Sequence, residues 1–473
     1  MSQWTHQSAR AAALKVLRQY NTHRGDAAEL LHSELDMTHR TGQATDLVYG
    51  VIRNTPLLDW LLTQVAAIQP RHVKPAIRGI LRMGVYELVF APKTADYAIV
   101  NEAVNLARRF GSRKIAGFVN GVLRQIQRQI ASRDVSLEHP RFDVRAIIPR
   151  TDGGGCALSS PLLPDPSPAP DDYLHLVWSL PRWLVRDWIA AYGAETAAQI
   201  CLACNRHPSV VAWPNTQRID SGTLAERLAA EGVTCRLLPV NGAVQLRRGR
   251  GPLTAVQAFR EGLFYVQDPT AEAVSTFLAP QPGDCLVDLC AAPGGKAIAC
   301  ALKMNDTGCI IASDASTTRL ARLDENTARL GLSCIRRVSQ NELDQAVRSL
   351  DRLDAIILDV PCSNTGVLAR RVEARHRLER GLPAPLLRRQ RELLEYAYAR
   401  LRPGAKLLYS TCSIHPKENT HQIQTFLQVH PDLYLIKEQI VFPSIENADA
   451  VDHDGGYMAL LGTLSIDDSG VFS

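Results

Sequence analysis

The 473-residue chain contains no uninterrupted apolar stretch of about 18 residues, so we expect no membrane-spanning helix. Its first residues, MSQWTHQSARAAALKVLRQY, interrupt their apolar positions with polar side chains and offer no small-residue cleavage site, so we expect no signal peptide. The eleven cysteines are an odd number scattered over a long chain, which argues against a disulfide framework and favours a reducing compartment. We therefore expect a cytoplasmic protein that makes no membrane contact.

A single compact core cannot organise a chain of this length, so about two to four domains are expected. Hydrophobic residues make up 46% and charged residues 21%, which is an ordinary globular composition. The net charge of +5 permits a nucleic-acid partner but does not demand one.

Residues 1–135 are predicted to form one helix after another. In AIVNEAVNLARRFGSRKIAGFVNGVLRQI, apolar residues follow the i, i+3, i+4, i+7 spacing on both sides of Gly111, where we expect one helix to end. Five basic residues fall mostly on the polar side, and they form either a solvated face or a weak RNA-contacting face: Arg108, Arg109, Arg113, Lys114 and Arg124.

Residues 136–172 are predicted to be a linker, because RTDGGGCALSSPLLPDPSPAPDD has too little apolar surface to become ordered. Residues 173–266 alternate helical and extended patterns, which indicates a small α+β module. That module contains Cys201 and Cys204 in a Cys-x-x-Cys, with His207 nearby. No second cysteine pair follows at zinc spacing, so we expect neither a metal site nor a redox site there.

Residues 267–473 are predicted to form a doubly wound, mostly parallel sheet. Helical stretches separate β-rich apolar runs at 286–289, 309–313, 334–338, 353–360 and 405–411. In such sheets ligands bind outside the carboxyl ends of the strands, so the functional residues should directly follow these runs.

The first of these runs leads into DLCAAPGGKA, a glycine-containing turn that starts a helix. A phosphate-binding Walker loop would need glycine where Cys290 stands and a hydroxyl residue where Ala297 stands, and the Gly-x-Gly-x-x-Gly dinucleotide pattern is absent. A loop around an adenosine-type cofactor with a carboxylate tail is the remaining interpretation. Asp314 follows the second run, where it is either a ribose ligand or an ordinary surface residue. Together these features indicate S-adenosylmethionine.

Three motifs, DLCAAPGGK, LDVPCSNTGVL and YSTCSIHPKEN, resemble those of the RNA 5-methylcytosine methyltransferases of the RsmB (Sun/Fmu) type. The stretches LRMGVYELVF and AIVNEAVNLARRFG resemble the NusB-like RNA-binding domain of that family. The resemblance implies an all-α NusB-like domain, a small α+β RNA-contacting module and a Rossmann-like methyltransferase domain. It also implies that the cofactor is bound by Cys290, Ala291, Ala292, Pro293, Gly294, Gly295, Lys296, Asp314 and Asp359.

The chemistry of cytosine methylation gives two thiols a use. A thiolate that adds to carbon 6 makes carbon 5 nucleophilic, and a second group must later help to release the adduct. The resemblance assigns attack to Cys412 and release to Cys362. Asp359 can hold the proton on ring nitrogen 3.

The chain departs from the family pattern at two positions near the cofactor. Gln340 stands where an acidic residue usually lies near the adenine, and Ala297 replaces a common threonine. The stretch 366–403 carries ten arginines against four glutamates beside the expected site. These arginines either bind looped RNA or form ordinary helical ion pairs.

The leading interpretation is an RNA cytosine-5 methyltransferase that acts on small-subunit ribosomal RNA as a monomer without a metal. The same chemistry on transfer RNA, and a non-catalytic RNA-binding or assembly factor, are the alternatives. An amino-methyltransferase is disfavoured because the sequence DVPC lacks the aromatic residue of an Asn/Asp-Pro-Pro-Tyr/Phe motif.

Overall fold

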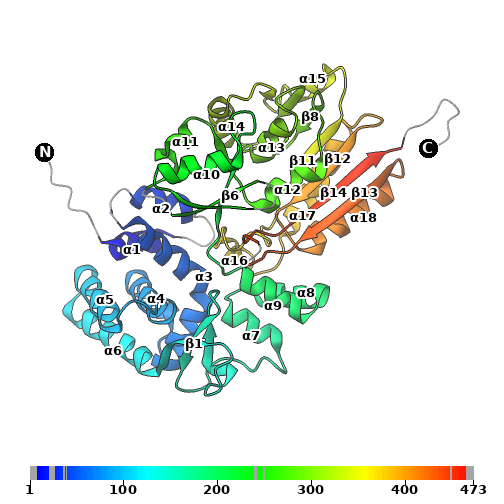
Figure 1. The fold of residues 1–473 in the computed structure, drawn as a ribbon. Coiled ribbons are helices and arrows are strands. Elements are labelled where there is room, and N and C mark those ends of the chain that lie inside the picture. The colour runs from blue at the N-terminus through cyan, green and yellow to red at the C-terminus, as the bar shows by residue number, and fades with distance from the viewer. Residues whose placement is uncertain are drawn as a thin grey trace. The chain divides into compact units, whose positions relative to one another are not determined.

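The computed structural model describes residues 8–464, with the exception of 21–26, 36–37, 39, 239–241, 249–250 and 448–449. The chain divides into two units, and Figure 1 labels their elements. Unit 1 consists of Met1–Arg206 together with Arg371–Gly381, and unit 2 consists of His207–Arg370 together with Leu382–Ser473. This division cuts the predicted module 173–266 at residue 206, and the domain boundaries stay predictions. In the described ranges, no helix has the length and apolar character needed to cross a membrane.

Unit 1 begins with helices, as the apolar periodicity predicts. Gly111 ends one helix, and Ser112 begins the next because its Oγ accepts a hydrogen bond from the Ile115 N–H at 3.3 Å. The elements are α1 (Ala9–Gln19), α2 (Ala27–Leu35), α3 (Thr41–Ala66), η1 (Pro70–His72), α4 (Pro75–Phe90), α5 (Asp96–Phe110) and α6 (Arg113–Gln129).

The predicted linker 136–172 is wrong for much of its length, because the chain there completes a small sheet. Ile148 and Cys156 are fully buried in it. A few apolar residues suffice to add short strands to a unit whose helices already supply a core, although they would not order an isolated segment. The antiparallel sheet has the order β1-β3-β2 and consists of β1 (Ile130–Ser136), β2 (Ile147–Pro149) and β3 (Gly154–Leu158), with η2 (Val144–Ala146) before β2.

Three helices complete the first part of unit 1: α7 (Pro170–Val177), α8 (Arg182–Tyr192) and α9 (Ala194–Ala203). Cys201 and Cys204 lie at the end of α9 and are fully buried, and this burial raises the pKa of Cys201. Among the described residues, no three His, Cys, Asp or Glu side chains form a group that could hold a metal ion.

The segment 371–381 returns to unit 1 and carries the short helix α16 (Ala374–Arg377). The Arg375 side chain is only 1% exposed. Its guanidinium donates to the backbone carbonyls of Arg53 at 2.8 Å and Cys204 at 3.0 Å. Arg375 therefore serves the packing of unit 1, so neither alternative for the arginines of 366–403, RNA binding or a helical ion pair, describes it.

Unit 2 begins with a four-stranded antiparallel sheet in the order β5-β6-β4-β7. The alternating helical and extended patterns of the sequence predict these elements. They are β4 (Val210–Pro214), α10 (Ser221–Ala230), β5 (Thr234–Leu237), β6 (Val244–Arg248), η3 (Leu253–Ala255), α11 (Gln257–Arg260) and β7 (Phe264–Val266).

The larger sheet of unit 2 has seven strands in the order β10-β9-β8-β11-β12-β14-β13. The first five are parallel and confirm the five predicted runs, whereas β14 runs antiparallel to both of its neighbours. The strands are β8 (Cys285–Asp288), β9 (Cys309–Ala312), β10 (Ile335–Arg337), β11 (Ala355–Asp359), β12 (Lys406–Thr411), β13 (Leu433–Val441) and β14 (Gly456–Thr463).

Helices cover both faces of this sheet, so its central strands are apolar without interruption. Leu286 and Ile357 belong to one buried cluster, and their neighbours Val287 and Ile356 belong to the other. The helical elements are α12 (Pro269–Leu278), α13 (Gly295–Lys303), α14 (Thr317–Leu330), α15 (Leu343–Arg348), α17 (Ala384–Tyr398), η4 (Pro416–Glu418) and α18 (Thr420–Val429).

The order of the strands locates a ligand crevice. From the central strand β8 the chain first adds β9 and β10 on one side, and it then crosses over to add β11 and β12 on the other. The connections that follow β8 and β11 therefore diverge between these two strands. This is the topological switch point at which parallel sheets bind ligands.

Candidate functional site

The predicted cofactor loop, Cys290–Lys296, lies at this switch point between β8 and α13. Gly294 has a φ of +111°, and a Cβ there would lie 2.4 Å from the Leu323 side chain, so only glycine suits the turn. The backbone can thus approach a ligand closely where α13 begins.

The start of α13 also offers an unused hydrogen-bond acceptor. Gln267 Oε1 is buried and finds no hydrogen-bond partner among the described residues. Its carboxamide lies next to Gly295, because a Cβ on that glycine would be 3.0 Å from Gln267 Nε2. A buried, unpaired acceptor beside a glycine suits the ammonium of an amino-acid tail, so these residues fit the expected cofactor.

Asp314 follows β9 at the same edge of the sheet and is 8% exposed. Its carboxylate accepts hydrogen bonds from the backbone N–H of Ala292 at 3.1 Å and of Ser316 at 2.8 Å. It therefore fixes the cofactor loop, and its remaining lone pairs can accept ribose hydroxyls.

Asp288, the last residue of β8, is 1% exposed and accepts a hydrogen bond from the Cys290 N–H at 3.2 Å. Burial, together with the nearby Asp359 carboxylate, raises the pKa of Asp288 to about 7. A carboxyl group that changes its charge near neutral pH thus lies beneath the cofactor loop.

The two predicted catalytic thiols lie side by side. Cys362 follows β11 and Cys412 follows β12, and because these strands are parallel neighbours the two Sγ atoms are 2.8 Å apart. The Cys412 thiol also donates to Asn364 Oδ1 at 3.2 Å. Gly366 permits this close approach, since a Cβ there would lie 2.9 Å from the Cys412 carbonyl oxygen.

Contact between the thiols affects the protonation of Cys362. The hydrogen bond to Cys412, and then burial, raise the pKa of Cys362 well above its usual value. Cys362 is therefore held as a neutral thiol at neutral pH, which suits a proton carrier better than a nucleophile.

Lys296 and Asp359 form an ion pair beside the thiols, with 2.6 Å between Nζ and Oδ2. The Ser410 hydroxyl donates to the other Asp359 oxygen at 3.0 Å. Burial alone would lower the pKa of Lys296, but the Asp359 carboxylate outweighs it and the pKa is raised. Lys296 and Cys412 both line a small cavity of about 50 Å³.

The two departures from the family pattern are both visible in the structure. Gln340 lies in an exposed turn after β10, where its amide is accessible. Ala297 is fully buried in the first turn of α13 and brings no hydroxyl to the loop.

Sequence reasoning missed the side chains that support the thiols. Asn364 has a φ of +64°, a conformation that asparagine tolerates better than most residues, and it accepts the Cys412 thiol hydrogen. Ser363, Ser413 and Glu418 form a buried network next to both cysteines. All four stand within the motifs LDVPCSNTGVL and YSTCSIHPKEN, which was the only available signal.

The basic stretch 366–403 separates into three parts in the structure. Arg370 is bound to Asp268 at 2.9 Å and Asp454 at 2.7 Å, and residues 371–381 belong to unit 1. The remaining part forms α17. This helix contacts the loop that carries Cys362, since Gln390 donates to the Pro361 carbonyl at 3.0 Å. Three arginines of α17 are exposed: Arg388, Arg389 and Arg391.

A basic groove runs between α5 and α6 in unit 1. It encloses about 380 Å³, and its lining contains no acidic side chain. Exposed Gly117 leaves its floor open. Three arginines and two asparagines supply its polar groups: Arg108, Arg113, Arg124, Asn101 and Asn120.

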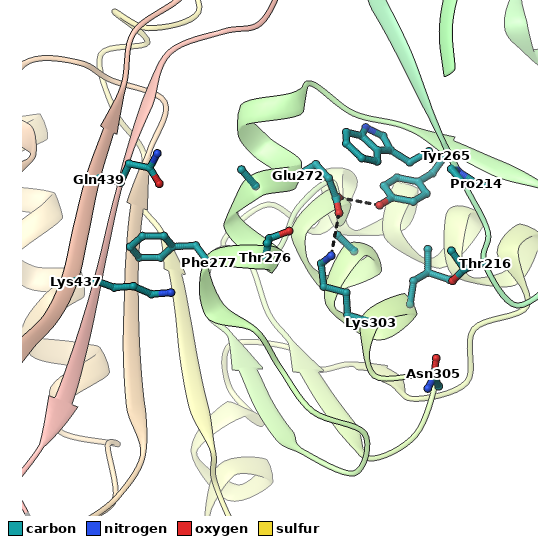
Figure 2. Close-up of a pocket in the computed structure, with 14 residues that line it drawn as sticks. Pro214, Thr216, Tyr265, Glu272, Thr276, Phe277, Lys303, Asn305, Lys437 and Gln439 are labelled. Carbon is teal, nitrogen blue, oxygen red and sulfur yellow. Dashed lines mark hydrogen bonds and ion pairs between the residues drawn. The ribbon is translucent and has the colours of Figure 1, made fainter. Parts of the chain in front are cut away.

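A larger cavity of about 650 Å³ is lined by residues of α12, α13 and β13, among them Glu272, Lys303 and Lys437 (Figure 2). Its charged groups are partnered within the wall. Lys303 lies 3.8 Å from Glu272, and the Lys437 ammonium lies 4.4 Å from the centre of the Phe277 ring. None of the predicted site residues lines this cavity.

Comparisons with known proteins match three successive parts of the chain to family models. Residues 7–128 match the NusB family, and residues 180–251 match the ferredoxin-like domain of RsmF/B-like methyltransferases. Residues 275–453 match the model described as 16S rRNA methyltransferase RsmB/F. The predicted combination of a NusB-like domain, a small sheet module and a Rossmann-like methyltransferase domain is therefore confirmed.

Individual relatives extend the similarity over most of the chain. A probable ribosomal RNA small subunit methyltransferase B of Bacillus subtilis is 30% identical over 90% of this chain and 89% of its own length. The crystal structure of PH0851 has a TM-score of 0.71 at 22% identity and covers 96% of this chain and 98% of its own. NSun6 from Pyrococcus horikoshii, solved with SFG, has a TM-score of 0.51 at 20% identity and covers 59% of this chain and 97% of its own.

Proposed function

Because the chain belongs to the RsmB/F family of 16S rRNA methyltransferases, we propose that it methylates carbon 5 of a cytosine in small-subunit ribosomal RNA through a covalent cysteine adduct. S-adenosylmethionine, held by Cys290–Lys296 and Asp314, supplies an electrophilic methyl group on a sulfonium. The single observation that carries the proposal is the 2.8 Å distance between the Sγ atoms of Cys362 and Cys412.

The reaction begins at Cys412. Its thiolate adds to carbon 6 of the cytosine, forming a sulfur–carbon bond and turning the ring into an enamine. Asp359 holds the proton on ring nitrogen 3 as the electrons move toward the ring, and Lys296, 2.6 Å away, keeps this carboxyl group in place. Carbon 5 is then nucleophilic enough to take the methyl group.

The second half of the cycle restores the aromatic ring. The Cys362 thiol gives its proton to the departing Cys412 sulfur and takes the proton from carbon 5, so that the carbon 5–carbon 6 double bond forms again and Cys412 leaves as a thiol. The contact between the two thiols and the raised pKa of Cys362 support this role in release. The two thiols thus have different duties in one cycle.

The RNA needs contacts beyond the reacting base. The exposed arginines Arg388, Arg389 and Arg391 on α17 can pair with phosphates or stack on unpaired bases. The groove between α5 and α6 supplies a second basic surface with amide groups that can reach base edges. Both features favour a structured RNA over a small nucleotide as the substrate.

The proposal is tested by incubating the purified full-length protein with S-adenosylmethionine and protein-free 16S rRNA, 23S rRNA or transfer RNA. Bisulfite sequencing then locates any 5-methylcytosine. A single new 5-methylcytosine in 16S rRNA is the expected result. Methylation of transfer RNA alone would show that transfer RNA, and not 16S rRNA, is the substrate. Methylation at a ring atom other than carbon 5 would refute the proposed chemistry.

A further inference from the structure

Glu418 is a carboxylate with no exposed surface that lies beneath the two thiol loops. It ends the short turn η4, which follows the Cys412 loop. Isolating a charged group from water is costly, so such a residue persists only where hydrogen-bond donors compensate it. The donors around Glu418 therefore show which segments of the chain this carboxylate holds in place.

The donors come from three separate elements. The Ser363 N–H donates to Oε1 at 2.9 Å, and the Ser363 hydroxyl donates to Oε2. The Ser413 hydroxyl donates to Oε2 at 2.5 Å. The Gln390 amide of α17 donates to Oε1 at 2.9 Å. One carboxylate therefore joins the loop after β11, the loop after β12 and helix α17.

The position of the two serines gives this arrangement its meaning. Ser363 directly follows Cys362, and Ser413 directly follows Cys412. Binding both serines to one carboxylate therefore fixes the backbone at each thiol relative to the other. A second link supports it, because Thr365 Oγ1 lies 2.8 Å from Ser413 Oγ.

A carboxylate suits this position better than its neutral amide. All four groups around Glu418 donate, and a carboxylate offers only acceptors. A glutamine of the same shape would turn an N–H₂ group toward donors on one side. Hydrogen bonds to a charged acceptor are also shorter and stronger than neutral ones.

We propose that Glu418 is a positioning residue that holds Cys362 and Cys412 in the mutual geometry that thiol addition and release require. It acts through Ser363 and Ser413 and touches neither substrate nor cofactor. The kinetic part of this inference rests on the proposed function, whereas the geometric part concerns the thiols alone. The two parts can be tested separately.

The geometric test uses phenylarsine oxide, which condenses with two adjacent thiols to form two arsenic–sulfur bonds and water. The full-length wild-type protein should chelate it through Cys362 and Cys412. The Cys362→Ala variant gives the baseline, including any binding at Cys201 and Cys204. In Glu418→Gln the part of the phenylarsine oxide affinity that exceeds this baseline should fall by about tenfold or more, because the hydrogen bonds to the charged carboxylate are lost.

The kinetic test compares kcat with KM. Glu418→Gln should lower kcat by about tenfold or more while the KM values for RNA and S-adenosylmethionine change by less than about threefold. Glu418→Asp keeps the negative charge and should retain more of the kcat. Glu395→Gln is the matched control, because Glu395 bonds to His430 at 3.1 Å and touches neither thiol loop.

The outcomes separate the inference from the proposed function. A folded Glu418→Gln protein with wild-type arsenical affinity overturns the positioning role, whatever its kcat. Lost arsenical affinity in a protein whose wild type shows no methylation supports positioning and refutes the function. If Glu418→Gln does not fold, Ser363→Ala and Ser413→Ala each remove one donor and should each weaken arsenical binding; no weakening in either variant would overturn the inference.

Discussion

The Lys296 ammonium lies 2.6 Å from the Asp359 carboxylate, and this ion pair connects the two halves of the site. Lys296 closes the cofactor loop after β8, whereas Asp359 ends β11 and precedes the Cys362 loop. The pair raises the pKa of Lys296 in spite of its burial, so the lysine stays charged. One ion pair thus orders both the predicted cofactor loop and the Asp359 carboxyl group.

The first prediction concerns this carboxyl group. Asp359→Asn should lower kcat by about a hundredfold or more, because the amide cannot exchange a proton with ring nitrogen 3. Binding of RNA should change little, as measured by filter binding. Asp351→Asn, at an exposed position before β11, is the control. Nearly unchanged turnover in Asp359→Asn would remove Asp359 from the chemistry.

The second prediction concerns the pH dependence of stability. The folded-state pKa of Asp288, about 7, lies above that of an unfolded aspartate. Between about pH 4 and about pH 7 the folded protein therefore binds more protons at Asp288 than the unfolded protein does. Protonation of Asp288 thus favours the folded state: its contribution to stability is fully present below about pH 4 and is lost as the pH rises to about 7 and above.

Asp288→Asn should remove this contribution, because the amide stays neutral and its oxygen can still accept from the Cys290 N–H. The fall in Tm between about pH 5 and about pH 8 should be smaller in the variant than in the wild type. Calorimetry at the two pH values measures it. Equal falls in both proteins would show that Asp288 does not titrate in this range.

The third prediction concerns the cofactor. Asp314→Ala should weaken S-adenosylmethionine binding by about tenfold or more. It removes the proposed acceptor for the ribose hydroxyls, and it also removes the hydrogen bond that holds the Ala292 N–H of the loop. Isothermal titration calorimetry measures the change. Asp324→Ala, an exposed residue paired with Arg337, should bind as the wild type does. Unchanged affinity in Asp314→Ala would remove Asp314 from the cofactor site.

The fourth prediction concerns RNA. Replacing both Arg108 and Arg113 with glutamine should weaken RNA binding and reduce the slope of log affinity against log salt by about 1.5. Binding of S-adenosylmethionine should not change. Arg145→Gln is the control, since Arg145 is a partly exposed arginine of the same unit that is paired with Asp143 at 2.6 Å. A double variant with the wild-type salt slope would exclude the groove from the RNA contact.

Point variants are better than a truncation for this purpose. Deleting residues 1–135 would remove the Arg53 carbonyl that binds the buried Arg375 guanidinium. Trp178, Asn205 and Cys204 would still accept from this guanidinium, but a buried donor that loses a partner costs about 1–3 kcal/mol. A truncated protein would therefore confuse lost RNA contacts with damaged packing.

The core of the candidate site could be predicted from the sequence because its signals are local. A β-rich run followed by Gly294 and Gly295 indicates a strand, a turn and a helix, and parallel strands bring Cys362 and Cys412 to one edge. The parallel strands are buried on both faces and read as continuous apolar runs. These features need no knowledge of distant residues.

The parts that could not be predicted depend on partners far away in the chain. Arg375 looks like one more exposed arginine, and only the carbonyls of residues 53 and 204 explain its burial. β2 and β3, of three and five residues, are short, and three successive glycines (153–155) run into β3, so no local pattern separates them from a linker. Glu418 reads as an ordinary polar residue until four donors surround it.

In the proposed cycle, Cys412 attacks the base and Cys362 assists its release. Removing the release group should halt the cycle after methyl transfer, with the protein still bound to RNA, whereas removing the nucleophile should prevent any bond from forming. The double variant should behave like Cys412→Ala, because attack precedes release.

The most direct measurement is denaturing electrophoresis of the full-length protein after incubation with 16S rRNA and S-adenosylmethionine carrying a labelled methyl group. Cys362→Ala should give a labelled protein–RNA band that survives denaturation, and Cys412→Ala should give neither band nor product. A band from Cys412→Ala but not from Cys362→Ala would reverse the assignment. Full activity without any band in both variants would contradict the covalent mechanism itself.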